Sequence, residues 1–394
     1  MRIDLKTAQI LTSDEARETL ALFSNHGDDP LSLQESFRGL FPKKTAEALG
    51  ELTALRRRGA QKFSRGLQMF FTREQLEQAS SERVAAYRAE RMRKAGFHEV
   101  WDPCCGIGAD AIALAAAGLA VHAWDKDPSA VHFARANAEV CGAGGIEFRE
   151  ADCTTEMPGP GAIFIDPSRR KGSRRLMSPD EWSPKPADIA RLLEGRPGAC
   201  VKLSPAVPLE LLLAKFPAPG EIETISLSGE AKETLFWYGA CASGVPRRAT
   251  LLPAGDSYAG AEDGQAPVGE LAEYVYDPDP AVVRSGLLGA LAKEHGLCAL
   301  DPEIAYLTGK KKVRTPFLDA FRVVATEALD PRKMRSLLRD LQVGRLEVRK
   351  RGVTDRPLTM EQKFLPRAFG ERTLTLIACR IGERHLGILA EPVS

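Results

Sequence analysis

Residues 100–110 constrain the fold of this chain more than any other segment. A short apolar run ends in Asp102, glycines follow at 106 and 108, and an Ala-rich stretch continues to Gly118. This order predicts a buried parallel strand, a glycine turn and a helix that stops at Gly118. Glycines at a helix start let a ligand approach the backbone closely. The segment therefore predicts the first strand–turn–helix unit of an α/β sheet that binds a ligand at the turn.

Acidic residues follow three further predicted strands in the same way. The predicted strands cover residues 119–124, 145–149 and 161–165. Asp125, Asp152 and Asp166 come after them in that order. In open α/β sheets ligands lie beyond the carboxyl ends of the strands, so these acids are expected at one edge with Asp102. We expect Asp125 to accept hydrogen bonds from both ribose hydroxyls of a nucleoside cofactor and Asp152 to meet the adenine amine.

A nicotinamide dehydrogenase is the first alternative for such a sheet. It would carry Gly-x-Gly-x-x-Gly after the first strand, whereas no glycine stands three residues after Gly108 and Asp102 precedes the turn. A cofactor with an amine and a sulfonium in place of a pyrophosphate tolerates that acid. The pattern therefore favours S-adenosylmethionine (SAM). We assign the cofactor site to Asp102, Cys104, Gly106, Gly108, Asp110, Asp125, Lys126, Asp152, Cys153 and Asp166.

Composition favours a cytoplasmic enzyme. A chain of 394 residues with 44% hydrophobic content can bury more than one core, so two to three domains are expected. No apolar run reaches membrane-spanning length, and the first residues do not form a signal peptide. The cysteines contain no Cys-x-x-Cys pair and the histidines show no metal spacing, so neither a disulfide framework nor a metal is expected. Cys104 and Cys105 are interpreted as small turn residues beside the cofactor.

The predicted organisation has four parts. Residues 1–78 are expected to form a helical region, with a capping box at Thr72–Gln75. Residues 79–245 carry the series of acids, and residues 246–320 are expected to be a connector that begins with a Pro- and Gly-rich loop at 252–269. Residues 321–394 are expected to form a small α/β domain with a helix at 331–341 and strands near 345–350, 374–380 and 385–389.

Basic residues are clustered although the net charge is only +1. Residues 169–175 hold five cations and no acid, and they begin at the turn after Asp166. Local positive potential there would attract a polyanion, and arginine matches phosphate geometry and stacks on bases. Residues 56–58 are interpreted as a solvated helix face. We assign substrate binding to Arg169, Arg170, Lys171, Arg174, Arg175, Arg349, Lys350 and Arg351.

Five segments share the motifs of one known family: residues 76–82, 165–170, 202–205, 230–237 and 348–352. With them the chain resembles bacterial class I SAM-dependent methyltransferases that carry a C-terminal THUMP-like domain. The resemblance implies a Rossmann-like methyltransferase sheet and a small basic accessory domain. THUMP domains proper are associated with RNA-modifying enzymes, so it also implies RNA as the substrate class. It gives no role to Lys232, Glu233 or Trp237.

The residues after the fourth and fifth strands bear on which atom is methylated. Methylation of a pyrimidine carbon needs a cysteine nucleophile. The sequence at the position expected for this cysteine is Leu203-Ser204-Pro205, so methylation of carbon is disfavoured. The turn after Asp166 resembles the Asp/Asn-Pro-Pro-aromatic turn of enzymes that methylate nitrogen. It keeps the acid and the first proline, and arginine, which can also stack on a base, replaces the aromatic residue. A base nitrogen is therefore expected as the target, with ribose oxygen second. The catalytic turn consists of Asp166 as acceptor from the target amine, Pro167 as shaper of the turn, Ser168, and Arg169 as base or phosphate clamp.

Two other functions stay open at this point. One is an RNA-binding protein whose cofactor pocket has decayed, and the intact acids and glycines of the cofactor series argue against it. The other is a methyltransferase of a small molecule or a protein. The basic turn after Asp166 and the expected accessory domain disfavour that alternative without excluding it.

Overall fold

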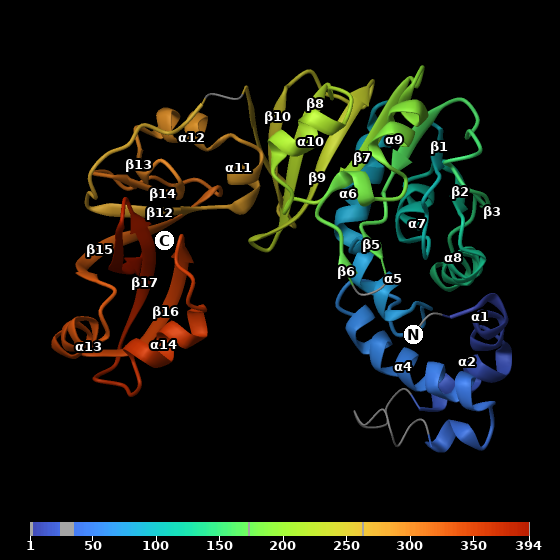
Figure 1. Cartoon of the computed structure of the whole chain (residues 1–394), viewed down its shortest axis with the longest axis horizontal. Coiled ribbons are helices and arrows are strands. Elements are labelled where there is room, and N and C mark those ends of the chain that lie inside the picture. The colour runs from blue at the N-terminus through green and yellow to red at the C-terminus, as the bar shows by residue number, and fades with distance from the viewer. Residues whose placement is uncertain (1–2, 24–34, 172–173, 262–263, 394) are drawn as a thin grey trace. The chain divides into compact units, whose positions relative to one another are not determined.

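The computed structural model describes residues 3–23, 35–171, 174–261 and 264–393 (Figure 1). The chain forms two compact units, and each is described by itself. The first comprises Met1–Glu221 with Glu233–Gly244, and the second comprises Ile222–Lys232 with Val245–Ser394. Within the described ranges, no helix is both long enough and apolar enough to cross a membrane.

The first unit begins with the predicted helical region. The helices there are α1 (Leu5–Leu11), α2 (Asp14–Leu22), α4 (Lys43–Gly59), α5 (Arg73–Gln78) and α6 (Glu82–Lys94). Thr72 and Gln75 form the predicted capping box at the start of α5. The sequence also predicts a helix at 31–39; residues 31–34 lie outside the described ranges, and residues 35–38 are helical. Phe70 and Phe71 are buried in the core of these helices.

The interpretation of residues 56–58 as a solvated face was wrong for Arg56. Its guanidinium is buried, donates hydrogen bonds to the carbonyl oxygens of Met69 (2.9 Å) and Gln68 (2.8 Å), and lies over the ring of Phe70. Burial lowers the pKa of Arg56 to about 10. Arg56 therefore fixes the loop that follows α4 instead of facing a partner.

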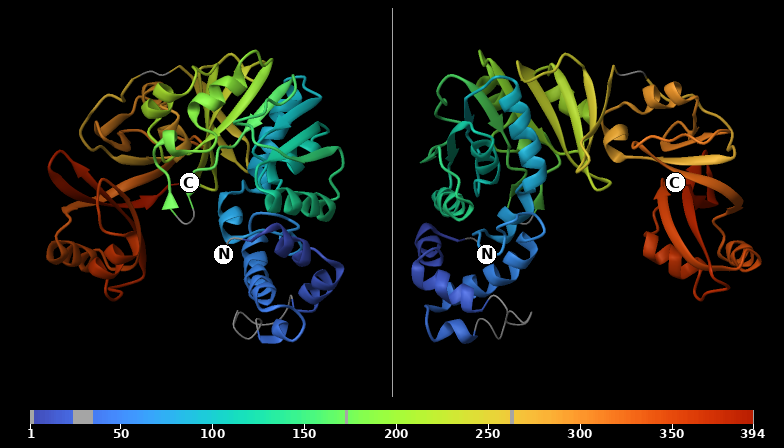
Figure 2. Two further views of the ribbon diagram at one scale, coloured as in Figure 1. Left: turned by 45° about the vertical axis from the view of Figure 1, so that its right-hand side comes forward. Right: turned by 180° about the vertical axis from the view of Figure 1, so that it is seen from behind.

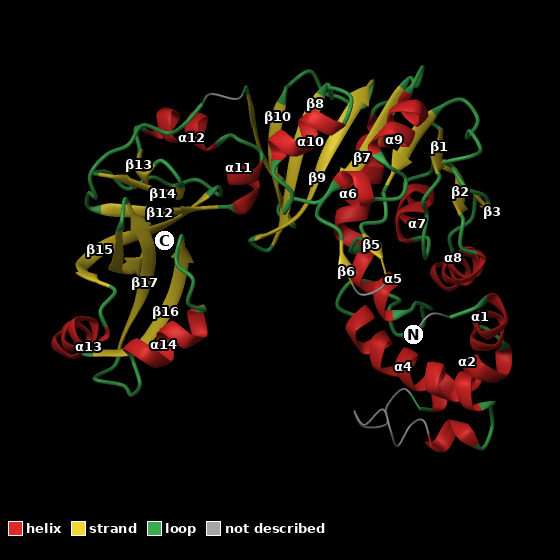
Figure 3. Ribbon diagram, viewed as in Figure 1, coloured by secondary structure: helices red, strands yellow, loops and turns green. Residues whose placement is uncertain are grey.

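The sheet of the first unit has the predicted Rossmann-like form (Figure 3). Neighbouring strands follow the order β9-β7-β4-β1-β2-β3, and only β9 is antiparallel to its neighbour. All residues of β4 and β7 are buried, as parallel strands covered on both faces require. The strands are β1 (Glu99–Asp102), β2 (Ala120–Asp125), β3 (Ile146–Glu150), β4 (Ala162–Ile165), β7 (Gly198–Leu203) and β9 (Glu230–Gly239). The helices that follow them are α7 (Ala109–Ala116), α8 (Pro128–Cys141), α9 (Pro186–Leu193) and α10 (Leu209–Lys215).

The second unit contains two groups of strands. In the first group β10 (Arg247–Leu252) pairs parallel with β8 (Glu221–Leu227) and antiparallel with β11 (Asp256–Gly260). The second group is a seven-stranded sheet in the order β13-β14-β12-β15-β18-β17-β16. Its strands are β12 (Tyr274–Pro278), β13 (Cys298–Asp301), β14 (Ile304–Gly309), β15 (Leu318–Ala328), β16 (Val343–Arg351), β17 (Arg372–Ile381) and β18 (Arg384–Pro392). The helices are α11 (Pro280–Arg284), α12 (Leu288–His295), α13 (Pro331–Asp340) and α14 (Pro357–Phe364), and Figure 2 shows the unit from two further sides.

The structure differs from the sequence-based expectation in three places of this unit. The expected loop at 252–269 contains strand β11, because Gly255 adopts a left-handed φ of +86° and turns the chain back into a hairpin with β10. The segment expected to connect the domains supplies β12, β13 and β14 to the seven-stranded sheet. Helix α14 was not predicted, whereas α13 and the three strands after it lie where they were expected.

Candidate cofactor and catalytic site

The four predicted acids lie at one edge of the sheet. Asp102 and Asp125 are the last residues of β1 and β2, and Asp152 and Asp166 follow β3 and β4. Because these four strands are parallel neighbours in the order β4-β1-β2-β3, their carboxyl ends meet. This edge is where an α/β sheet binds its ligand.

The glycine turn leaves backbone open at the start of α7. Gly106 and Gly108 have φ of +54° and +81°, conformations that side chains rarely adopt. A Cβ at Gly108 would lie 3.1 Å from Cβ of Ala134, so glycine there also permits close packing of α7 on α8. A Cβ at Gly106 would meet nothing within 4 Å. The turn can therefore present its backbone to a bound ligand.

Asp102 provides a test of whether a cationic cofactor fits this edge. Its carboxylate is fully buried, and Oδ1 accepts a hydrogen bond from the amide of Cys104 at 3.3 Å. Oδ2 is buried and has no partner within the part of the chain that is described. Burial, and then the nearby Asp110, raise the pKa of Asp102 well above its usual range. A buried acceptor without a partner is costly, so the site suits a ligand that brings a positively charged donor, as the amine of SAM does.

Backbone amides hold the next two acids in place. Asp125 accepts hydrogen bonds from the amides of Gly106 and Asp127, both at 2.9 Å. Oδ1 of Asp152 accepts from the amide and the hydroxyl of Thr154 at 2.9 and 2.8 Å. A carboxylate oxygen has more than one lone pair, so both groups can still accept from a nucleoside. The predicted ribose and adenine acceptors are thus fixed in orientation before a ligand binds.

Two other residues assigned to the cofactor already have side-chain partners. Nζ of Lys126 donates to Oγ of Ser183 at 2.7 Å. Asp110 is buried and forms an ion pair with Arg88, and it also accepts from Oγ of Ser80 at 3.2 Å. Asp110 therefore lies in a protein-internal network, where Arg88 lowers its pKa against the opposing effect of burial.

The same network explains residues whose role the sequence left open. Arg88 of α6 forms a second ion pair with Glu233 of β9, and both side chains are 2% exposed. Arg91 stacks on Trp237, with its guanidinium 4.2 Å from the ring centroid. These contacts hold α6 against the sheet. Lys232 forms an exposed pair with Glu230 instead.

The turn predicted to be catalytic contains a pairing that the sequence interpretation missed. Nζ of Lys202, the residue of β7 beside the end of β4, lies 2.5 Å from Oδ2 of Asp166. The Lys202 side chain is 5% exposed and that of Asp166 is 21% exposed. A lysine in the otherwise apolar strand Gly198–Leu203 was the available indication. Pro167 is buried, and Ser168 next to it forms a β-bridge with Ser183.

The basic residues after this turn form a short hairpin. Strand β5 (Arg170–Lys171) pairs antiparallel with β6 (Arg174–Arg175). Arg174 is exposed, and Arg169 before the hairpin is half-buried. The side chains of Arg170, Lys171 and Arg175 lie outside what the structure describes. The hairpin begins four residues after Asp166. The basic residues therefore lie next to the turn that contains Asp166.

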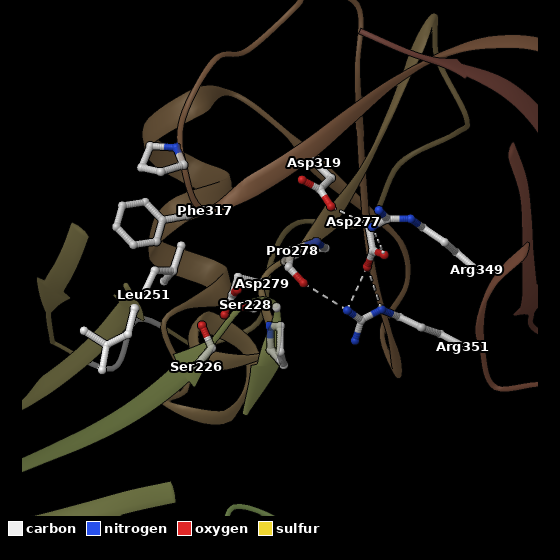
Figure 4. A pocket seen from close by; sticks show the side chains of 14 residues that line it. Ser226, Ser228, Leu251, Asp277, Pro278, Asp279, Phe317, Asp319, Arg349 and Arg351 are labelled. Carbon is white, nitrogen blue, oxygen red and sulfur yellow. Dashed lines mark hydrogen bonds and ion pairs between the residues drawn. The ribbon is translucent and has the colours of Figure 1, made fainter. Parts of the chain in front are cut away.

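Two cations of the second assigned group, Arg349 and Arg351, line a cavity of about 640 Å³ in the second unit (Figure 4). Arg349 pairs with Asp277 (2.9 Å) and Asp319 (2.7 Å), and Arg351 pairs with Asp277 (2.8 Å). Lys350 donates to the carbonyl oxygen of Val353 at 2.7 Å. Aspartates thus balance much of the charge that was assigned to substrate binding. Across the described ranges, no three His, Cys, Asp or Glu side chains gather as a metal site would require.

Comparison with known proteins adds three findings to this geometry. Residues 318–392 match a family model described as THUMP domain-like. Uncharacterized S-adenosylmethionine-dependent methyltransferases from two strains of Mycobacterium tuberculosis are 33% identical over 345 residues, which cover 86% of this chain and 94% of each relative. The crystal structure of a proposed methyltransferase from Porphyromonas gingivalis W83 aligns over 100% of both chains with a TM-score of 0.74 at 19% identity, which shows a shared fold.

Proposed function

Because this chain belongs to the family of S-adenosylmethionine-dependent methyltransferases, we propose that it methylates RNA and that the acceptor is a base nitrogen. The observation that carries the RNA proposal is the THUMP-like domain at residues 318–392. THUMP domains proper are associated with RNA-modifying enzymes. The basic hairpin that starts beside the catalytic turn supports the same substrate, because it places positive charge where a polyanion would approach.

The residues at the strand ends account for cofactor binding. Bound SAM supplies an activated methyl group. Oδ2 of Asp102 would accept from its amine, the backbone at Gly106 would lie along it, and Asp125 and Asp152 would accept from the ribose and the adenine. Since the backbone already orients these carboxylates, little ordering remains to be done when the cofactor binds.

Asp166 and Lys202 account for the orientation of the target. Lys202 donates to Oδ2 of Asp166, so Oδ1 would be the oxygen that accepts from an incoming amine. A hydrogen bond from the amine to Oδ1 would place the nitrogen for in-line attack, and positioning of this kind supplies much of the rate in transfers from an activated donor. Arg169 would then stack on the base or bind a neighbouring phosphate.

The experiment that tests this proposal compares total RNA from a strain lacking the protein with RNA from its parent, after digestion to nucleosides and mass spectrometry. We expect one base-methylated nucleoside to disappear and to return with the wild-type gene but not with Asp166→Ala. Loss of a ribose-methylated nucleoside would replace the base nitrogen with the ribose oxygen. Unchanged RNA would reject the RNA substrate and favour a small molecule or a protein.

A further inference from the structure

The turns after β1 and β3 bring two cysteines together at the cofactor edge. Sγ of Cys104 lies 3.9 Å from Sγ of Cys153, although the two residues are 49 positions apart in sequence. The main chain holds both turns to the end of β2: the amide of Cys105 donates to Trp124 O at 2.8 Å, and the amide of Ala151 donates to Asp125 O at 3.1 Å. The two thiols therefore meet across the end of the strand that lies between them.

From this juxtaposition we propose that Cys104 and Cys153 form a reversible disulfide that closes the SAM site under oxidising conditions. The sulfurs must approach from 3.9 Å to a bonding distance of about 2 Å. That movement draws the turn holding Gly106 and the turn holding Asp152 toward each other over Asp125. The space for the ribose and adenine narrows as a result.

The two thiols are suited to different steps of this oxidation. Cys104 is half-buried and gives an oxidant access, whereas Cys153 is buried beside it. The contact with the Cys104 thiol lowers the pKa of Cys153, which favours Cys153 as the thiol of the pair that loses its proton more readily. Among the other cysteines of the first unit that the structure describes, no two have sulfur atoms in comparable contact.

The chemistry balances with a peroxide as the oxidant. Attack of a thiolate on hydrogen peroxide breaks the O–O bond, oxidises that sulfur to a sulfenic acid and releases hydroxide. The second thiol then attacks the sulfenic sulfur, forms the S–S bond and releases water once the thiol proton is transferred. The sum consumes two thiols and one peroxide and yields one disulfide and two waters. A thiol reductant reverses the bond by exchange.

The test measures SAM binding by calorimetry before and after treatment of the full-length protein with hydrogen peroxide. Oxidation should lower SAM affinity on the order of tenfold or more, because the cross-linked protein adopts a conformation open enough to bind only in a small fraction of molecules, and dithiothreitol should restore the affinity. Peptide mapping should find the Cys104–Cys153 cross-link, and saturating SAM should slow its formation.

Variants separate this site from general oxidation damage. Cys104→Ser and Cys153→Ser should each make SAM affinity independent of peroxide, whatever their starting affinity. Cys141→Ser removes another half-buried thiol and should respond to peroxide like the wild type. Failure to detect the cross-link, or a cross-linked protein that binds SAM as tightly as the reduced one, would overturn the proposal. Neither result depends on the identity of the methylated substrate.

Discussion

The ammonium group of Lys202 lies 2.5 Å from Oδ2 of Asp166, at the point where β7 and β4 end side by side. Each residue comes from a different strand, and the parallel register that sets Val201 opposite Ile165 brings the next residues together. The acid of the catalytic turn thus has a fixed cationic partner. This pair is the most direct point at which the proposed mechanism can be tested.

Lys202→Met should lower kcat by about 10- to 100-fold, since loss of a hydrogen bond to a charged group costs about 1–3 kcal/mol. Lys202→Arg should restore part of that loss. Asp166→Ala should reduce turnover to a small residual rate, and adding Lys202→Met should lower that residual rate no further, because the two residues act as one unit. Steady-state kinetics on the methylated substrate, with SAM affinity as the control, measures this. If Lys202→Met lowered kcat by the same factor in the wild type and in Asp166→Ala, Lys202 would act independently of Asp166.

Asp125→Ala should weaken SAM binding by about 1–3 kcal/mol, the range for hydrogen bonds to a charged group. The variant also loses the acceptors for the amides of Gly106 and Asp127, so its circular dichroism must be compared with that of the wild type. Glu147→Ala, an exposed acid on the adjacent strand, is the matched control and should leave affinity unchanged. Unaltered affinity in Asp125→Ala, measured by calorimetry, would remove Asp125 as the ribose ligand.

SAM affinity should rise with pH over a range above about 4, the usual pKa of aspartate. The pKa of Asp102 is raised by burial, so its carboxyl group is protonated in the free protein at pH values where aspartate is normally ionised. The positively charged amine of SAM favours the ionised carboxylate, and binding therefore releases a proton and is weakened as pH falls through the raised pKa. Calorimetry in buffers of different ionisation enthalpy detects that proton. Asp102→Asn should bind without releasing it, and a wild-type protein that releases none would contradict the assignment.

Replacing Arg174 and Arg175 with alanine should weaken RNA binding across sequences and flatten its salt dependence. Each lost phosphate contact should reduce the log–log salt slope by about 0.7 to 0.9. Arg93→Ala, an exposed arginine paired with Glu90 in α6, serves as the control. RNA affinity at several salt concentrations measures the effect, while SAM affinity should not change. If the plots of RNA affinity against salt concentration coincided for the wild type and the double variant, the hairpin would be only a solvated surface.

Glu233→Ala should destabilise the first unit by about 3–5 kcal/mol, the cost of breaking a buried ion pair from one side. Among the described residues, Arg88 would keep the carboxylate of Asp110, the hydroxyl of Ser80 and the ring of Phe164 as contacts in its buried position. Glu230→Ala removes an exposed acid three residues earlier and should change stability by less than about 0.5 kcal/mol. Urea unfolding followed by circular dichroism compares the two. Similar stabilities would mean that the network around Arg88 contributes little to the fold.

The local part of the structure was predictable from sequence. Strand ends, the glycine turn and the caps depend on residues within a few positions of each other, so the acids at 102, 125, 152 and 166 could be assigned to one sheet edge in advance. The capping box at Thr72 and the position of α13, expected at 331–341 and found at Pro331–Asp340, follow from the same short-range chemistry. The series of acids and the glycine turn favoured SAM as the cofactor, the resemblance of five segments indicated the methyltransferase family, and the relatives confirm the family.

Pairings between distant segments depended on the tertiary structure. The sequence contains Asp110, but only the fold places Arg88 and Glu233 beside it and so turns an expected cofactor ligand into part of a buried ion network. Likewise, Lys202 meets Asp166 because the neighbouring strands β7 and β4 end together, and Cys104 meets Cys153 because β1 and β3 end at the same edge on either side of β2. The physical reason is that local propensity determines each strand and turn, whereas strand register and burial determine which side chains from different strands share one low-dielectric environment. That arrangement in turn sets the charge of the site and the chemistry of its thiols.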